Sequence, residues 1–175
     1  GVKLPHATLQ TEDVDVAQFQ NVSFAIRDTT PPVLEILKGA DKTFREVGGF
    51  DPRRPSASYK NGRGLRVDFL TPNQGPDSDQ SRSLPAFQTD AQPLRFLDYL
   101  IHNAEPAVVL YGGGIYVSVP APERYAVHKL IVFRRRSGGS GKQEKDLRQA
   151  ESLLGALVQK RPFDLKSVWE EAWRR

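Results

Sequence analysis

Hydrophobic and polar residues alternate along several short segments in the first two thirds of the chain. This period of two is typical of strands with one buried face, because successive side chains on a strand point to opposite faces. A hairpin turn is predicted at Asn61-Gly62, because both residues tolerate positive φ. The predicted strands cover residues 13–26 (one or two strands), 44–47, 57–60, 64–70, 107–110 and 115–119. Residues 94–101 could form a strand or a short helix, and the strand is favoured.

The remaining segments have helical spacing of their apolar residues. A hydroxyl followed by two prolines, Thr29-Thr30-Pro31-Pro32, is typical of a helix start. Trp169 and Trp173 are four residues apart and share one helix face, where we expect core packing rather than a base-stacking platform. The predicted helices cover residues 33–38, 120–136 and 142–159, with a short last helix from Pro162 or Asp164.

Three segments have the composition of turns or loops. Residues 71–92 are rich in Pro, Asp, Ser and Gln, which predicts a long, mobile surface loop suited to act as a lid. Gly112-Gly113-Gly114 would suit either a phosphate cradle or a hairpin turn. The turn is favoured, because no helix and no Lys-Ser/Thr follows. Residues 137–141, Ser-Gly-Gly-Ser-Gly, predict a flexible break that is either natural or a replaced segment.

The order of these elements predicts an α+β fold. We expect a mixed, twisted sheet region over residues 1–120 and a helical region over residues 121–175 packed on it. A chain of 175 residues is long enough for one domain with a real core. No apolar run approaches the roughly 18 residues of a membrane-spanning helix, so we expect no membrane partner.

Composition narrows the chemistry further. The formal charge of +4 favours polyanionic partners, although a solvated basic surface is an alternative explanation. The absence of cysteine excludes disulfides, thiol catalysis and cysteine zinc sites; it fits a reducing compartment, and we expect a cytoplasmic location. The chain has no methionine and begins at Gly1, so we expect it to be part of a longer protein.

Acidic residues occur within two of the predicted strands, where acids are normally depleted. Asp13 and Asp15 would emerge on one face, roughly 7 Å apart, with Val14 and Val16 on the other. If the strand that carries Asp68 lies beside them, three carboxylates converge. Their mutual repulsion would be relieved by Mg²⁺ or Mn²⁺, and two such ions can hold both oxygens of a phosphoryl displacement. The alternative is that the aspartates are ordinary strand-end or turn residues.

Three motifs together resemble the nucleotidyltransferase (polymerase-β-like) superfamily, and in particular a bacterial group of uncharacterised proteins with this fold. They are residues 12–15 (Glu-Asp-Val-Asp), 65–70 (Leu-Arg-Val-Asp-Phe-Leu) and 123–130 (Glu-Arg-Tyr-Ala-Val-His-Lys-Leu). The resemblance extends from residue 1 to about residue 165.

The resemblance implies transfer of a nucleoside monophosphate from an NTP, such as ATP, to a hydroxyl of an RNA, protein or small-molecule acceptor. Asp13, Asp15 and Asp68 would be the catalytic metal ligands, and Asp68 would also assist deprotonation of the acceptor. Lys129 would contact the triphosphate; alternatively, it is a surface lysine with a buried stem. His128 is expected to pack on the helix rather than to participate.

One expected motif is missing. Members of the superfamily have a Gly-Ser or Gly-Gly before the first aspartate pair, whose backbone amides hold phosphates, and residues 1–12 contain neither. Either that element lies upstream or this member is degenerate. Two alternatives to the enzyme therefore stay open: an inactive nucleotidyltransferase fold that serves as a binding module, and a basic nucleic-acid-binding domain.

Overall fold

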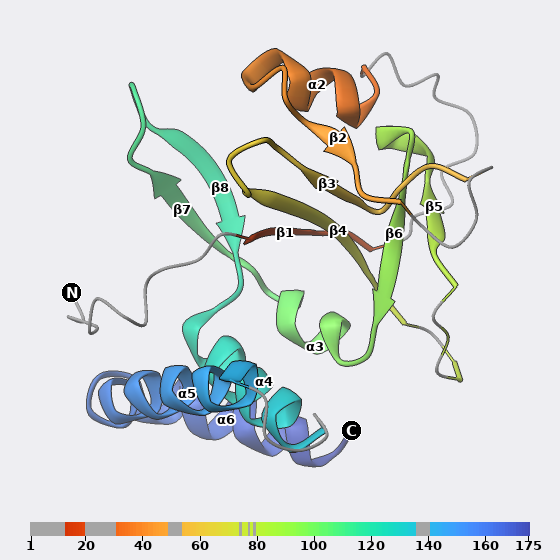
Figure 1. Ribbon diagram of the computed structural model, residues 1–175. Helices are drawn as coiled ribbons and strands as arrows, with labels where there is room; N and C mark the ends of the chain where they lie inside the picture. Colours follow the sequence, from red (N-terminus) through yellow and green to blue (C-terminus); the bar gives the residue numbers. More distant parts are fainter. Residues whose placement is uncertain are drawn as a thin grey trace. The chain divides into compact units, whose positions relative to one another are not determined.

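The computed structural model forms two compact units (Figure 1). Described residues up to Asp98 belong to the first unit, and residues from Tyr99 onward belong to the second. The structure describes residues 13–19, 31–48, 54–73, 75–76, 78, 80–135 and 141–175. The predicted strand residues Val22, Phe24 and Ile26, the helix start at residues 29–30 and most of the break at residues 137–141 lie outside these ranges.

The first unit is built on a mixed sheet. Its order is β2-β3-β4-β6-β5, and β1 also pairs with β4. β1 and β6 run parallel to β4, whereas the other pairs are antiparallel. The predicted α+β class with a mixed sheet is confirmed. The elements are β1 (Asp13–Ala17), α2 (Val33–Ala40), β2 (Arg45–Glu46), β3 (Ser58–Lys60), β4 (Arg66–Pro72), β5 (Arg82–Leu84), η1 (Pro85–Phe87) and β6 (Thr89–Leu94).

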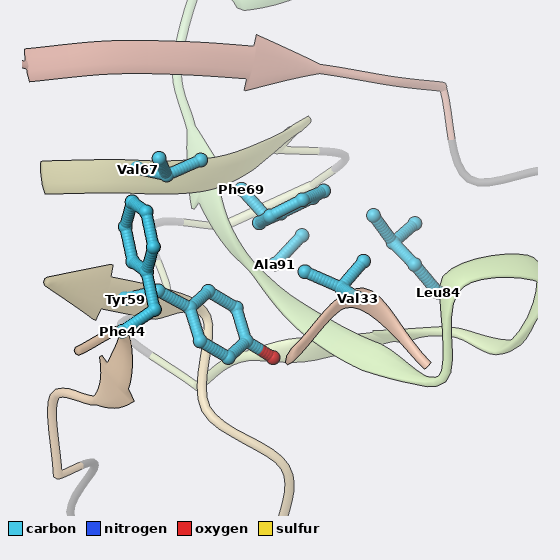
Figure 2. Close-up of a cluster of buried hydrophobic side chains, with 7 residues drawn as sticks. All are labelled: Val33, Phe44, Tyr59, Val67, Phe69, Leu84 and Ala91. Carbon is cyan, nitrogen blue, oxygen red and sulfur yellow. The ribbon is translucent and has the colours of Figure 1, made fainter. Parts of the chain in front are cut away.

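The core of this unit lies on one face of the sheet, between the strands and α2 (Figure 2). Tyr59 of β3 and Phe69 of β4 meet edge to face, with ring centroids 5.9 Å apart. Val67 and Phe69 are buried while Arg66 and Asp68 are only partly covered, so β4 alternates as its sequence predicts. The buried cluster consists of Val33, Phe44, Tyr59, Val67, Phe69, Leu84 and Ala91. The opposite face of β4 carries Arg66 and Asp68 in its first half and Leu70 and Pro72 in its second.

The β3–β4 hairpin forms at the predicted Asn61-Gly62, with a different turn geometry. The Asn61 side-chain oxygen accepts hydrogen bonds from the backbone N–H groups of Arg63 and Leu65. Positive φ occurs at Gly64, at 97°, and not at the Asn-Gly pair. The asparagine thus closes the loop with its side chain, and a glycine three residues later takes the left-handed conformation.

The predicted loop at residues 71–92 was wrong, because this segment contains β5, η1 and most of β6. Thr89, Asp90 and Ala91 are almost fully buried. Their polar groups are bonded within the core: the Thr89 hydroxyl donates to the Ser56 carbonyl, and Asp90 pairs with Arg54 at 2.9 Å. These tertiary partners override the weak strand propensity of the residues.

The second unit contains a hairpin and three long helices. The strand favoured at residues 94–101 was wrong for most of this segment, which forms the short helix that was its alternative. This helix, α3, includes residues of both units. The predicted hairpin forms, and Gly112 and Gly114 have positive φ in its turn. The elements are α3 (Leu97–Ile101), β7 (Glu105–Val109), β8 (Ile115–Val119), α4 (Pro122–Arg135), α5 (Gly141–Lys160) and α6 (Pro162–Trp173).

Helices α4, α5 and α6 pack on one another. Burial of Ala126, Val127, Ala150 and Leu157 gives α4 and α5 their inner faces. The tryptophans, expected to be core or packing residues, are not in the core: Trp173 is 77% exposed and Trp169 is 41% exposed. Of the helices that the structure describes, none has the length and apolar character needed to span a bilayer.

Candidate active site

The three candidate aspartates lie on neighbouring strands. β1 and β4 are parallel, with Asp15 opposite Asp68 and Asp13 opposite Arg66. Because partners in register point to the same side of a sheet, these side chains share the face opposite the core, with adjacent strands about 4.8 Å apart. Val14 and Val16 point to the other face, and Val16 packs against the core cluster. The structure therefore places the acids that the sequence singled out on one face of two neighbouring strands.

Asp68 is held in place by two neighbours that the sequence analysis did not single out. The Nε of Arg66 donates to Oδ1 of Asp68 at 2.8 Å and to Oδ2 at 2.9 Å. Ser58, opposite Asp68 on β3, donates its hydroxyl to Oδ1 and accepts a hydrogen bond from Nη2 of Arg66 at 3.1 Å. The carboxylate is thus fixed by one cation and one hydroxyl on the same face.

Arg66 interacts electrostatically with all three acids. Its hydrogen bond with Asp68 is the main cause of its raised pKa, and the charges of Asp68, Asp13 and Asp15 raise the pKa further. Asp13 and Asp15 are exposed, while the Asp68 side chain is 21% exposed. Arg66 is therefore the cation that these three carboxylates share.

The donor set fits a hard divalent ion. Mg²⁺ and Mn²⁺ prefer carboxylate oxygens, and two adjacent strands present three of them on one face. Within the described residues, no three acidic or histidine side chains are grouped so that they could hold a metal ion in the present arrangement. In this arrangement the Asp68 carboxylate faces Arg66 and Ser58. An ion at Asp68 would replace part of these contacts.

Lys129 lies on α4 of the second unit, where it joins two helices. Its ammonium donates to Asp146 of α5 at 2.8 Å and lies 5.1 Å from the ring centroid of Tyr125. The neighbouring His128 has a pKa lowered to about 4, mainly by burial and also by the charge of Lys129. His128 is therefore neutral near pH 7, as expected of a packing residue. The expected contact between Lys129 and triphosphate stays a prediction.

A protein-family model described as "Nucleotidyltransferase" matches residues 1–174. The chain belongs to the nucleotidyltransferase family. This confirms the resemblance drawn from its three motifs and supports nucleotidyl transfer as its general function. A search of curated proteins and a search of solved structures found no match.

The sequence analysis of this nucleotidyltransferase did not identify Arg66 and Ser58 as contacts of Asp68. A sequence pattern could have indicated Arg66, and a correct strand register could have indicated Ser58. Arg66 precedes Asp68 by two residues, and the strand period places the two side chains on one face. Ser58 becomes visible only through the register of the β3–β4 hairpin, which pairs it with Asp68. That register depends on the loop from Asn61 to Leu65, whose geometry the Asn-Gly pair alone did not determine.

Proposed function

We propose that the chain is a metal-dependent nucleotidyltransferase that moves a nucleoside monophosphate from an NTP to a hydroxyl of an RNA, protein or small-molecule acceptor. The observation that carries this proposal is the register of β1 and β4, which places Asp15 beside Asp68 and Asp13 on the same face. Family membership supports nucleotidyl transfer in general. The metal, the donor and the acceptor class belong to the proposal.

In this reaction the acceptor oxygen attacks the α-phosphorus of the NTP, the bond to the β-phosphate breaks, and pyrophosphate leaves. Asp13, Asp15 and Asp68 would hold Mg²⁺ or Mn²⁺, which supplies charge stabilisation for the attacking and leaving oxygens. Asp68 would accept the proton of the acceptor hydroxyl. For this role the carboxylate would exchange part of its present contacts with Ser58 and Arg66 for the ion and the acceptor.

The structure also gives a specific reason to consider an inactive binding module. Asp68 is engaged by Arg66 and Ser58, so a folded protein of this sequence has a stable arrangement in which Asp68 needs no metal. In such a module, neutralising Asp13 or Asp15 would leave stability unchanged or raise it, because like charges on one face repel. Binding of Mg²⁺ or Mn²⁺ distinguishes the two functions, because the enzyme requires the ion and the binding module does not.

The test measures transfer of the labelled α-phosphate from each NTP into a cell lysate, with Mg²⁺ or Mn²⁺ present. Asp15→Asn and Asp68→Asn should each lower labelling at least a hundredfold, because each removes a charged metal ligand. Glu144→Gln is the control, since Glu144 forms an exposed surface pair with Arg148 and should retain full labelling. Equal labelling by wild type and both aspartate variants would refute the proposal, as would a wild-type protein that binds neither ion.

A further inference from the structure

The face of the sheet that carries the aspartates also carries a row of basic side chains. Arg66 of β4 lies opposite Lys60 of β3, and Lys60 lies opposite Arg45 of β2. The hydrogen bonds among Ser58, Arg66 and Asp68 establish which face this is, because Ser58 and Lys60 are two residues apart on β3. We call Arg66, Lys60 and Arg45 the basic row.

The basic row is unfavourable for folding by itself. Like charges directly opposite each other on neighbouring strands destabilise a sheet, and the row contains two such pairs in succession. Lys60 and Arg45 are exposed, and neither forms an ion pair with another described residue. Arg66 gives Nε to Asp68 and Nη2 to Ser58, but a guanidinium has more N–H donors than these contacts use.

The adjacent row of the same face has the opposite charge. Asp15 of β1 lies opposite Asp68 of β4, which is a like-charged acidic pair. This acidic pair, in which Asp68 is held by Arg66, therefore borders a basic mismatch that a polyanion would relieve. A nucleoside triphosphate with its metal ions presents this combination of charges, with phosphate oxygens beside the ions.

We propose that the basic row binds the triphosphate of the donor nucleotide, with Arg66 joining it to Asp68. This inference rests on the proposed function, which supplies the donor. Lysine acts toward phosphate as a point charge, and arginine adds paired N–H donors. The competing explanation is that the exposed basic residue on β2, the edge strand, only prevents pairing with other chains.

The experiment measures binding of inorganic tripolyphosphate to the full chain by calorimetry, which removes any contribution from the base and ribose. The variant Lys60→Gln/Arg45→Gln should weaken this affinity at least tenfold. The matched control is Lys38→Gln, which removes an exposed positive charge from α2, the helix that packs on the opposite face. It should change the affinity less than twofold.

Thermal stability gives a second readout, because a role limited to edge protection predicts no stabilisation by tripolyphosphate. Without ligand, Lys60→Gln should melt at the same temperature as wild type or higher, because it relieves repulsion from Arg66 and Arg45. With tripolyphosphate, wild type should gain more stability than the variant. The inference is overturned if wild type does not bind tripolyphosphate, or if the double variant binds it as tightly as Lys38→Gln does.

These outcomes are distinguishable from failure of the proposed function. Suppose that the wild type transfers nucleotide, that Asp15→Asn abolishes this transfer, and that the double variant keeps full affinity for tripolyphosphate. The inference alone is then wrong. If wild type binds tripolyphosphate through the row yet labels nothing with any NTP, the inference stands as a polyphosphate site and the proposed function is wrong.

Discussion

At the scale of single residues, position on a strand decides what an aspartate does. Asp68 and Asp90 are both strand residues of the first unit, and both meet an arginine and a serine. Asp90 is 1% exposed in its side chain and ties its strand to the rest of the unit. Asp68 is on the open face beside Asp15. Asp90 therefore serves the fold, whereas Asp68 lies on the face to which the proposed function assigns the chemistry.

His128 gives a prediction about pH. Its pKa is about 4 in the folded chain, against about 6.5 in the unfolded chain, so the unfolded state binds more protons between these values. Stability should therefore fall as pH is lowered from 7 to 5, with His128 contributing about 2 kcal/mol of the loss. The measurement is the free energy of unfolding by urea at both pH values.

Substitution separates this histidine from the carboxylates that titrate in the same range. His128→Gln should reduce the loss of stability between pH 7 and 5, whereas His102→Gln, at an exposed position, should retain the wild-type loss. An unchanged pH dependence in His128→Gln would show that burial of His128 is not the cause.

At the scale of elements, ion pairs connect the helices of the second unit. Lys129 of α4 and Asp146 of α5 form a pair in which the Asp146 side chain is only 4% exposed. Arg124 of α4 similarly holds Glu171 of α6 with two hydrogen bonds, which lower the pKa of Glu171. The sequence marked Lys129 as a phosphate ligand, but its neighbours also give it a role in joining helices.

Lys129→Met should destabilise the protein by roughly 3 kcal/mol, because it removes the ammonium group that faces a buried carboxylate. The double variant Lys129→Met/Asp146→Asn should recover most of this loss, as measured by urea unfolding. Lys166→Met, which breaks an exposed pair with Glu170, should cost less than about 1 kcal/mol.

The same double variant tests the triphosphate role of Lys129. If Lys129 only joins α4 and α5, the double variant should bind ATP with wild-type affinity once its stability is restored. A tenfold or greater loss of ATP affinity in this stably folded variant would instead assign Lys129 to the nucleotide.

At the scale of the whole molecule, charge favours polyanions only weakly. The formal charge is +4, and many arginines of the described residues are paired with carboxylates, including Arg54, Arg66, Arg124, Arg148 and Arg161. We therefore expect RNA binding no tighter than the usual non-specific range, about 10⁻⁴ to 10⁻⁶ M at physiological salt. Titration of labelled RNA at several salt concentrations measures this.

The same RNA titration with the aspartate variants distinguishes non-specific binding from binding that depends on the candidate active site. Non-specific binding should fall steeply with salt and should be indifferent to Asp15→Asn and Asp68→Asn, because phosphate contacts come from basic residues. Tight, salt-resistant RNA binding would favour the nucleic-acid-binding domain over the enzyme.

The sequence by itself determined the local features of the protein. The period of two placed Asp13 and Asp15 on one strand face and set Asp68 on the face of β4 that Val67 and Phe69 do not occupy. Glycine and asparagine located both hairpins, and helical spacing located α4 and α5. These features depend on neighbours along the chain, which is why a single sequence contains them.

Only the tertiary structure decided how distant segments pair. The parallel register of β1 on β4 placed Asp15 beside Asp68, and the same sheet aligned Arg66, Lys60 and Arg45 into one row. Burial of β6, a segment with the composition of a loop, depends on polar partners that come from other strands and loops. Pairing across a sheet is set by long-range packing and hydrogen bonding, and local propensity does not specify it.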